Sequence, residues 1–230
     1  MVMAVDEQIS FDQWIAYVFD HPVTNRQWHF DMTSDYWDGP PADIVVYLTR
    51  TFEECETVFW PFSDAQVAQG LNFLISPSCS DFAFTLLETD VSLVDRLHCI
   101  DAMATLFERY FALRCSPHLS RLDVAATPED VSPLNGICYM WWDVLPLHGL
   151  IKHRPEHPDA EVLDRAIMVV LRRILMLDSV ACQESALFGL AFWTMYYPEI
   201  DEVIDEFIAH HGDLFERFRP EVRKTVFGEQ

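Results

Sequence analysis

The apolar residues of this chain recur every three or four positions along most of its length. This spacing places them on one face of a helix, because an α-helix has about 3.6 residues per turn. One run consists of Leu93, Leu97, Ile100, Ala104, Phe107 and Phe111. Similar runs start near positions 42, 160 and 200, and we find no convincing alternation of the kind that marks a half-buried strand. The chain is therefore predicted to be all-α.

Serine residues mark where several of these helices begin. Ser10, Ser63 and Ser92 are each followed three residues later by Gln or Asp. This is the spacing of a capping box, in which each side chain binds the backbone amide of the other residue. We expect about eight or nine helices, over 10–20, 41–59, 63–75, 80–88, 92–115, 135–145, 159–177, 179–196 and 199–211.

The connections between these helices are short, except at 21–40 and 116–134. Successive helices joined by short turns pack as antiparallel hairpins. The predicted fold is therefore a stack of hairpins, either an irregular HEAT-like α-solenoid or an α–α bundle, with no fixed sequence repeat. We expect one domain over 1–230, with a candidate seam near 146–158.

The chain is strongly acidic, with 37 Asp and Glu against 15 Lys and Arg and a formal net charge of -22. It is also 50 % hydrophobic and 13 % aromatic, whereas a disordered acidic tail would be poor in aromatic residues. A folded protein with a negative surface repels nucleic acid and anionic lipid, and it attracts basic proteins. We therefore expect a basic protein partner, no nucleic acid and no membrane.

We expect the protein to be cytoplasmic. The N-terminal residues hold neither a basic region nor a long apolar segment, and the most apolar stretch, 166–177, is interrupted by Arg172 and Arg173. That stretch is well short of the roughly 20 residues that cross a bilayer. The six cysteines form no CxxC pair. They are predicted to be reduced and mostly buried rather than to form a zinc site or a disulfide framework.

Three histidines, His148, His153 and His157, precede Asp159 in a proline-rich stretch. Imidazole and carboxylate groups can bind zinc, but this spacing matches no established site, and an extended solvated loop is the simpler interpretation. We predict no metal, no cofactor and no catalytic residue. A small-molecule or metal-dependent enzyme that uses these histidines is kept as the second alternative function.

A further candidate is the run CQESALFGLAFW at 182–193. Cys182 or Ser185 could in principle act as a nucleophile, but Ser185 lacks the flanking glycines of a GxSxG nucleophile elbow. A helix that packs tightly at Ala186 and Gly189 explains the run without catalytic chemistry.

Together with NFLISPSCSDF, SPHLSRLD and NGICYMWWDVLPLHG, the run CQESALFGLAFW resembles a group of bacterial proteins of unassigned function. The resemblance covers most of the chain and implies no activity or cofactor. In that group the helix reads closer to QESALHGLGHW, so Phe188 and Phe192 stand where histidines are expected. If those histidines form a site in the relatives, this chain has lost it.

The segment 28–38 mixes large aromatic residues with three aspartates, and 199–206 carries a dense acidic helix face. Tryptophan and tyrosine are favoured at the centre of interfaces, and surrounding acid selects a basic partner. The predicted contact residues are Asp31, Asp35, Trp37, Asp38, Glu202 and Glu206.

These patterns favour an acidic helical module that binds a basic protein, in its most specific form a bacterial immunity protein that neutralises a toxin. The first alternative is a helical scaffold or adaptor with a peptide-binding groove. The oligomeric state is left open.

Overall fold

Helices form wherever the sequence shows the three-four apolar spacing. The computed structural model describes residues 9–30, 37–119, 131–211 and 215, and of His153 the backbone alone. Within these ranges the chain has eleven α-helices and no strand. The prediction of an all-α fold is therefore confirmed.

The first third of the chain supplies one end of the molecule. Its elements are α1 (Phe11–Phe19), the 3₁₀ turn η1 (Trp28–Phe30), α2 (Pro41–Glu53), α3 (Cys55–Val58), α4 (Asp64–Ile75) and the 3₁₀ segment η2 (Phe82–Leu87). The elements that follow are α5 (Leu93–Leu106), the π-helical segment η3 (Phe107–Phe111), α6 (Ala112–Arg114), α7 (Leu134–Val144), α8 (Leu150–His153), α9 (Ala160–Leu175), α10 (Val180–Trp193) and α11 (Ile200–His211).

The structure departs from the predicted helices in four places. The helix expected over 41–59 divides at Glu54 into α2 and α3, and the one expected over 80–88 is a 3₁₀ segment. The long helix over 92–115 contains the π-helical segment η3, and the short helix α8 lies inside the candidate seam. Each of these segments is only a few residues long, so the three-four spacing of the apolar residues continues through it. The sequence pattern therefore does not reveal these segments.

Two of the three predicted capping boxes are confirmed. At the start of α1, Ser10 Oγ accepts a hydrogen bond from the Gln13 amide at 3.3 Å, and Gln13 Oε1 accepts from the Ser10 amide at 2.8 Å. Ser63 caps α4 in the same way. The prediction for Ser92 is wrong, because its side chain makes no capping bond. Its partner would be Asp95, whose side chain is one methylene shorter than that of Gln.

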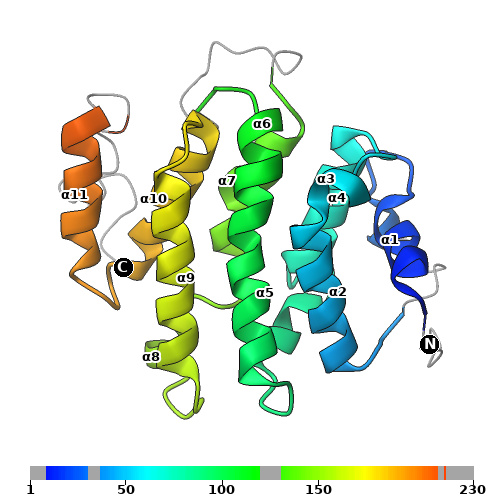
Figure 1. The fold of residues 1–230 in the computed structure, drawn as a ribbon, viewed down its shortest axis with the longest axis horizontal. Coiled ribbons are helices and arrows are strands. Elements are labelled where there is room, and N and C mark those ends of the chain that lie inside the picture. Colours follow the sequence, from blue (N-terminus) through cyan, green and yellow to red (C-terminus); the bar gives the residue numbers. More distant parts are fainter. Residues whose placement is uncertain (1–8, 31–36, 120–130, 212–214, 216–230) are drawn as a thin grey trace.

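The longer helices lie side by side in two rows (Figure 1). One row holds α2, α5 and α9, and the row behind it holds α4, α7 and α10. At one end α1 packs on α4 and α2, and at the other end α11 packs on α10. No described helix is both long and apolar enough to cross a membrane.

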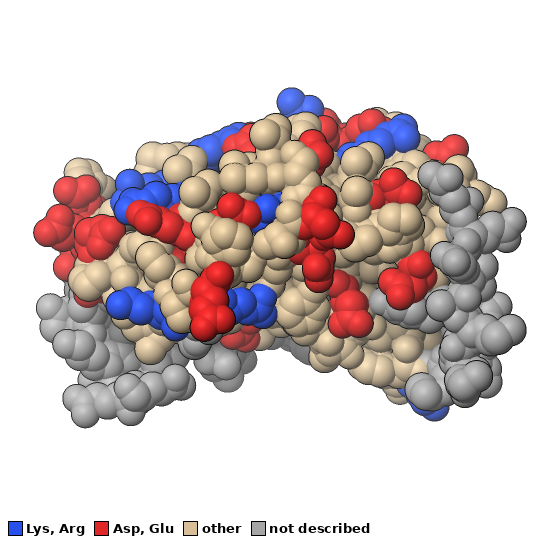
Figure 2. Space-filling model, turned by 90° about the horizontal axis from the view of Figure 1, so that it is seen from below, with Lys and Arg blue, Asp and Glu red and all other residues tan. Residues whose placement is uncertain are grey.

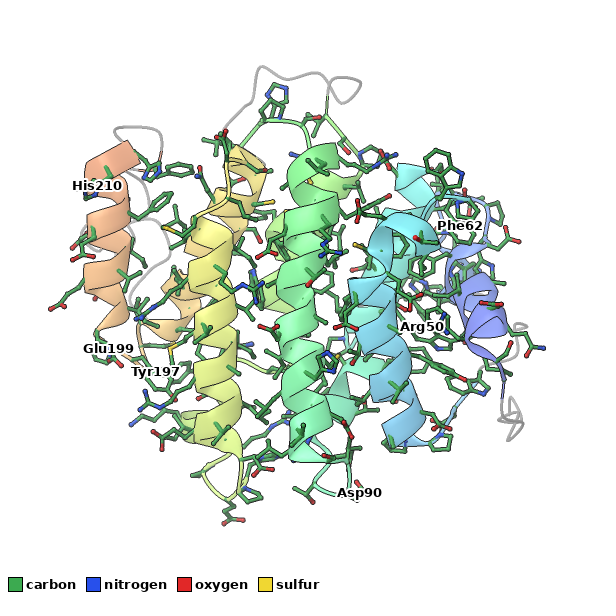
Figure 3. All side chains as sticks on the ribbon, in the orientation of Figure 1. Arg50, Phe62, Asp90, Tyr197, Glu199 and His210 are labelled. Atoms are coloured by element: carbon green, nitrogen blue, oxygen red, sulfur yellow. The ribbon has the colours of Figure 1, made fainter. Side chains whose placement is uncertain are left out.

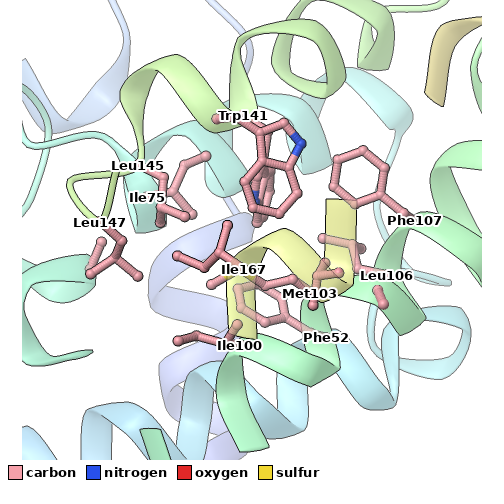
Figure 4. Close-up of a cluster of buried hydrophobic side chains, with 14 of the residues drawn as sticks. Phe52, Ile75, Ile100, Met103, Leu106, Phe107, Trp141, Leu145, Leu147 and Ile167 are labelled. Carbon is pink, nitrogen blue, oxygen red and sulfur yellow. The ribbon is translucent and has the colours of Figure 1, made fainter. Parts of the chain in front are cut away.

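The space between the two rows is filled by large apolar side chains (Figure 4). Trp141 of α7 is fully buried, and its ring lies edge-on to Phe52 of α2 at 5.7 Å and to Phe107 at 5.9 Å. Burial of a large apolar side chain contributes roughly 1.5–3 kcal/mol each. The buried hydrophobic residues form one cluster in space, and its members range from Phe11 to Phe215 along the chain. The assignment of one domain to 1–230 stays a prediction.

Candidate functional site: an acidic surface with one exposed tryptophan

Among the predicted contact residues, Trp37 lies in the core. Its side chain is 5 % exposed, and its ring packs against those of Tyr47 at 6.3 Å and Phe82 at 6.0 Å. Its backbone N–H donates to the Tyr17 hydroxyl at 3.4 Å. Because Tyr47 and Phe82 pack against the Trp37 ring, this ring is not exposed for a partner to contact. Asp31 and Asp35 lie outside the described residues.

The remaining three predicted contacts are exposed: Asp38, Glu202 and Glu206. The two glutamates are four residues apart in α11 and therefore share one face, opposite the buried face that contains Ile204 and Ile208. Asp38 precedes α2, towards the other end of the molecule (Figure 1). The structure therefore does not join the predicted contacts into one patch.

Part of the acidic surface has a local explanation. The helices α2, α5, α9 and α11 all begin at the lower end in Figure 1, and each has an acidic residue in its first turn. Carboxylates at helix N-termini are stabilised by the helix dipole, typically by about 0.3–1 kcal/mol. Seen from this end, Figure 2 shows red carboxylates towards α11 and across the middle, with blue groups beside several of them.

Several surface arginines of the described residues form ion pairs with carboxylates. The pairs are Arg50–Glu54 at 2.8 Å, Arg114–Asp64 at 2.8 Å, Arg165–Glu161 at 2.7 Å, and Arg173 with Asp101 at 2.6 Å and Glu108 at 2.9 Å. Surface ion pairs contribute little to stability, but each of them places a carboxylate against one of the positive groups. The potential outside the protein is therefore set by the excess carboxylates.

One exposed aromatic residue was missed by the sequence analysis. Trp60 is 87 % exposed in the turn between α3 and α4, one helical turn after the exposed Glu56. In contrast, Trp14, Trp141 and Trp193 are at most 1 % exposed. The sequence did hold a signal for it, because Trp60 falls outside the apolar stripe that ends at the buried Phe59.

The histidine-rich stretch does not form a converging site in the described residues. His157 accepts the Asp159 amide at Nδ1, at 3.2 Å, and its Nε2 lies 2.8 Å from the Leu87 carbonyl. The Asp159 carboxylate pairs with the buried Arg96 at 2.5 Å, while His148 Nδ1 lies 3.3 Å from the Leu145 carbonyl. No group of three or more His, Cys, Asp and Glu side chains in the described ranges is arranged to hold a metal ion.

Cys182 and Ser185 lie on α10, where every residue from 181 to 190 is buried. Ser185 Oγ donates a hydrogen bond of 2.5 Å to the Cys138 carbonyl on α7. Phe188 stacks on Tyr139 at 4.4 Å. These contacts are those of a tightly packed helix, as the sequence analysis proposed for this run.

A buried carboxylate, also missed in the sequence, holds the connections around α8. Asp164 of α9 has no exposed surface, and it accepts hydrogen bonds from the Leu150 amide at 3.0 Å, the Ile151 amide at 3.2 Å and the Tyr197 hydroxyl at 2.8 Å. Burial raises the pKa of Asp164, and these three hydrogen bonds oppose the rise. Tyr197 lies between the start of α11 and α9 (Figure 3), so the bond ties the α10–α11 connection to α9.

The hollows on the described surface include one between α2 and α5 and one by the end of α7. The first, of about 200 Å³, lies where His98 Nε2 is 2.7 Å from Glu53 Oε1. The other, of about 320 Å³, lies by the end of α7 and includes Phe84, His148 and Arg154. Pockets for small ligands usually measure about 300–1,000 Å³, so the first is too small and the second is at the lower limit.

Comparison of the chain with protein-family models, with curated proteins and with solved structures finds no match. The resemblance based on CQESALFGLAFW therefore stays a prediction.

Proposed function

We propose that this protein is a binding module for a basic protein, built as an irregular HEAT-like stack of helical hairpins. The two rows of helices support this arrangement. The six cysteines are free thiols and four of them are buried, which suits a reducing compartment such as the cytoplasm.

Trp60 is the single observation that carries the proposal. When a partner covers an exposed tryptophan, a large apolar area is removed from contact with water, which favours binding. Tryptophan is also enriched among the residues that contribute most to binding energy. Its indole face can also receive a lysine or arginine side chain. Glu56, which is exposed and lies four residues before Trp60, would favour such a cation.

The overall charge supports the same partner. A net charge of -22 attracts a cationic protein over a distance of about a Debye length, roughly 8–10 Å at physiological salt. The most specific form of the proposal is an immunity protein that covers the cationic site of a toxin. The hollow between α2 and α5 gives the scaffold alternative little support, because it is small and both Glu53 and His98 line it.

The test is a pull-down from the source cell's lysate at low salt, with salt-step elution and mass spectrometry. We expect a stoichiometric basic protein that elutes as salt rises. Its affinity should fall about 30-fold for Trp60→Ala, which corresponds to the roughly 2 kcal/mol of a dominant interface residue.

Val94→Ala is the matched control, since Val94 is a 73 % exposed apolar residue on α5, away from the α3–α4 turn. It should bind like the wild type. Equal binding by Trp60→Ala, or the absence of a basic partner, would contradict the proposal.

A further inference from the structure

Three cysteines from three separate elements meet near the start of α10. Cys115 directly follows α6, Cys138 lies in α7, and Cys182 lies in the first turn of α10. The thiol of Cys138 neighbours both of the others. It also lies 3.8 Å from the carbonyl of Ala181, the residue before Cys182.

Hydrogen bonds on both sides hold this group of thiols in place. Asn135, one turn before Cys138, accepts from the Ser116 amide at 2.8 Å and donates to the Ser116 carbonyl at 2.9 Å. These two bonds fix the residue after Cys115 against α7. On the other side, Ser185 of α10 donates to the Cys138 carbonyl at 2.5 Å. The proximity of the thiols is therefore built into the packing of α6, α7 and α10.

The other buried cysteines show what an isolated thiol looks like in this protein. Burial raises the pKa of Cys55 to about 11 and that of Cys99 to about 12, and it raises the pKa of Cys138 as well. These three thiols are therefore mostly protonated near neutral pH, and only their small thiolate fraction reacts. Cys182 differs, because hydrogen bonding to Cys138, and also to Ser179, lowers its pKa despite burial. Its position at a helix N-terminus acts in the same direction.

The group also has access to solvent. Cys115 is half-buried, whereas Cys138 and Cys182 have no exposed surface. A reagent in solution can therefore reach Cys115 first, whereas Cys138 and Cys182 are covered by the protein. Among the described residues, no three His, Cys, Asp or Glu side chains are arranged to hold a metal ion together. The arrangement of the three cysteines instead suits reactions between two thiols.

We propose that Cys115, Cys138 and Cys182 form an oxidation site, at which a small-molecule disulfide of the glutathione type converts two of the three thiols into an internal disulfide containing Cys138.

The reaction balances as two exchanges. The Cys115 thiolate attacks one sulfur of the small disulfide, which forms a mixed disulfide and releases one small thiolate. The Cys138 thiolate then attacks the Cys115 sulfur and releases the second small thiolate. The two protons lost by Cys115 and Cys138 are taken up by the two released thiolates. The protein loses two electrons and the small disulfide gains them.

Cys182 can then move the disulfide inward. Its thiolate attacks the Cys138 sulfur, a Cys138–Cys182 bond forms, and Cys115 leaves as a thiolate and is free again. The product joins α7 directly to α10. A disulfide across this pair of helices constrains the unfolded chain and should raise Tm.

The experiment treats the full chain with oxidised glutathione under native conditions, followed by alkylation in denaturant and non-reducing peptide mapping by mass spectrometry. We expect a loss of two hydrogen masses and a crosslinked pair that contains Cys138 with either Cys115 or Cys182. In Cys138→Ser the glutathione adduct should remain on Cys115. In Cys115→Ser, which removes the half-buried thiol, the rate of crosslinking should fall at least tenfold.

Cys79→Ser is the matched control, because Cys79 is also half-buried and is not among these three cysteines. It should crosslink like the wild type. Adducts without an internal crosslink in the wild type, or a crosslink that lacks Cys138, would overturn the proposal, and so would an unchanged rate in Cys115→Ser. Because the readout is a covalent mass, failure to find a basic partner would leave this result unaffected.

Discussion

The consecutive helices α10 and α11 differ in how much of their surface the protein covers. In α10 every residue from 181 to 190 is buried, including Glu184 and Ser185. In α11 four residues are buried and the remaining positions are exposed or half-buried, among them Glu202 and Glu206. The helices have similar lengths, so the difference comes from their neighbours. α10 packs against α7, α9 and α11, whereas α11 packs mainly on α10.

The comparison teaches that a helix with one neighbour keeps a readable apolar stripe, whereas a helix with three loses it. The residues of α10 then serve close packing instead. Gly189 is the clearest case, since a Cβ built there would lie 2.8 Å from Leu171 Cδ2 and 2.8 Å from Trp142 Cγ. The absence of a side chain is what lets α10 approach both α7 and α9.

The largest expected effect is therefore on α10. Gly189→Leu should lower the free energy of unfolding by about 3 kcal/mol, the upper part of the range for overpacked cores. Urea unfolding followed by circular dichroism measures it. Gly136→Ala in α7 is the matched control, because a Cβ there meets nothing within 4 Å. It should stabilise the protein by about 0.5–1 kcal/mol, and equal behaviour of the two variants would contradict the close packing of α10.

The next effect concerns the connection between the two helices. Tyr197→Phe removes a hydroxyl that donates to the buried Asp164 carboxylate at 2.8 Å, and it should cost about 2 kcal/mol near pH 7. Burial raises the pKa of Asp164, so the folded chain holds that proton more tightly than the unfolded chain. Stability linked to Asp164 is therefore greatest below its ordinary pKa and is lost as pH rises through the folded pKa.

The cost of Tyr197→Phe should accordingly shrink as pH falls and Asp164 becomes protonated. Urea unfolding at a series of pH values measures this. In the Asp164→Asn background the group no longer ionises, so the effect of Tyr197→Phe should not vary with pH. A cost that stays constant in the wild-type background would show that the charge of Asp164 is not involved.

The smallest effect is on the exposed face of α11. Glu206→Gln removes a charge four residues after the like-charged Glu202 and leaves the first-turn carboxylates of α11 in place, so it should stabilise the protein by a few tenths of a kcal/mol at low salt. The gain should vanish at about 1 M salt, where the Debye length is roughly 3 Å. Thermal unfolding at both salt concentrations measures it, and a loss of more than about 1 kcal/mol would mean that Glu206 makes stabilising contacts.

The candidate site was only partly predictable from the sequence. An acidic surface follows directly from the composition, and Glu202 and Glu206 were placed on the exposed face of α11 by its apolar spacing. The aromatic residue was misplaced, because Trp37 is buried and Trp60 is exposed. Trp37 directly precedes Asp38, whereas Trp60 stands between a phenylalanine and a proline. A search for aromatic residues beside acids therefore selected the tryptophan that fills the core, and only the position of Trp60 beyond the apolar stripe marked the exposed one.

The sequence by itself determined the helices of this protein, the serine caps of α1 and α4, and the sign of its surface, because spacing, capping and charge depend on residues close together in the chain. The tertiary structure decided that α10 is covered on all sides, that Asp164 holds Tyr197, and that Cys115, Cys138 and Cys182 meet. These features bring together residues from separate helices, and their positions depend on how the two rows pack against each other.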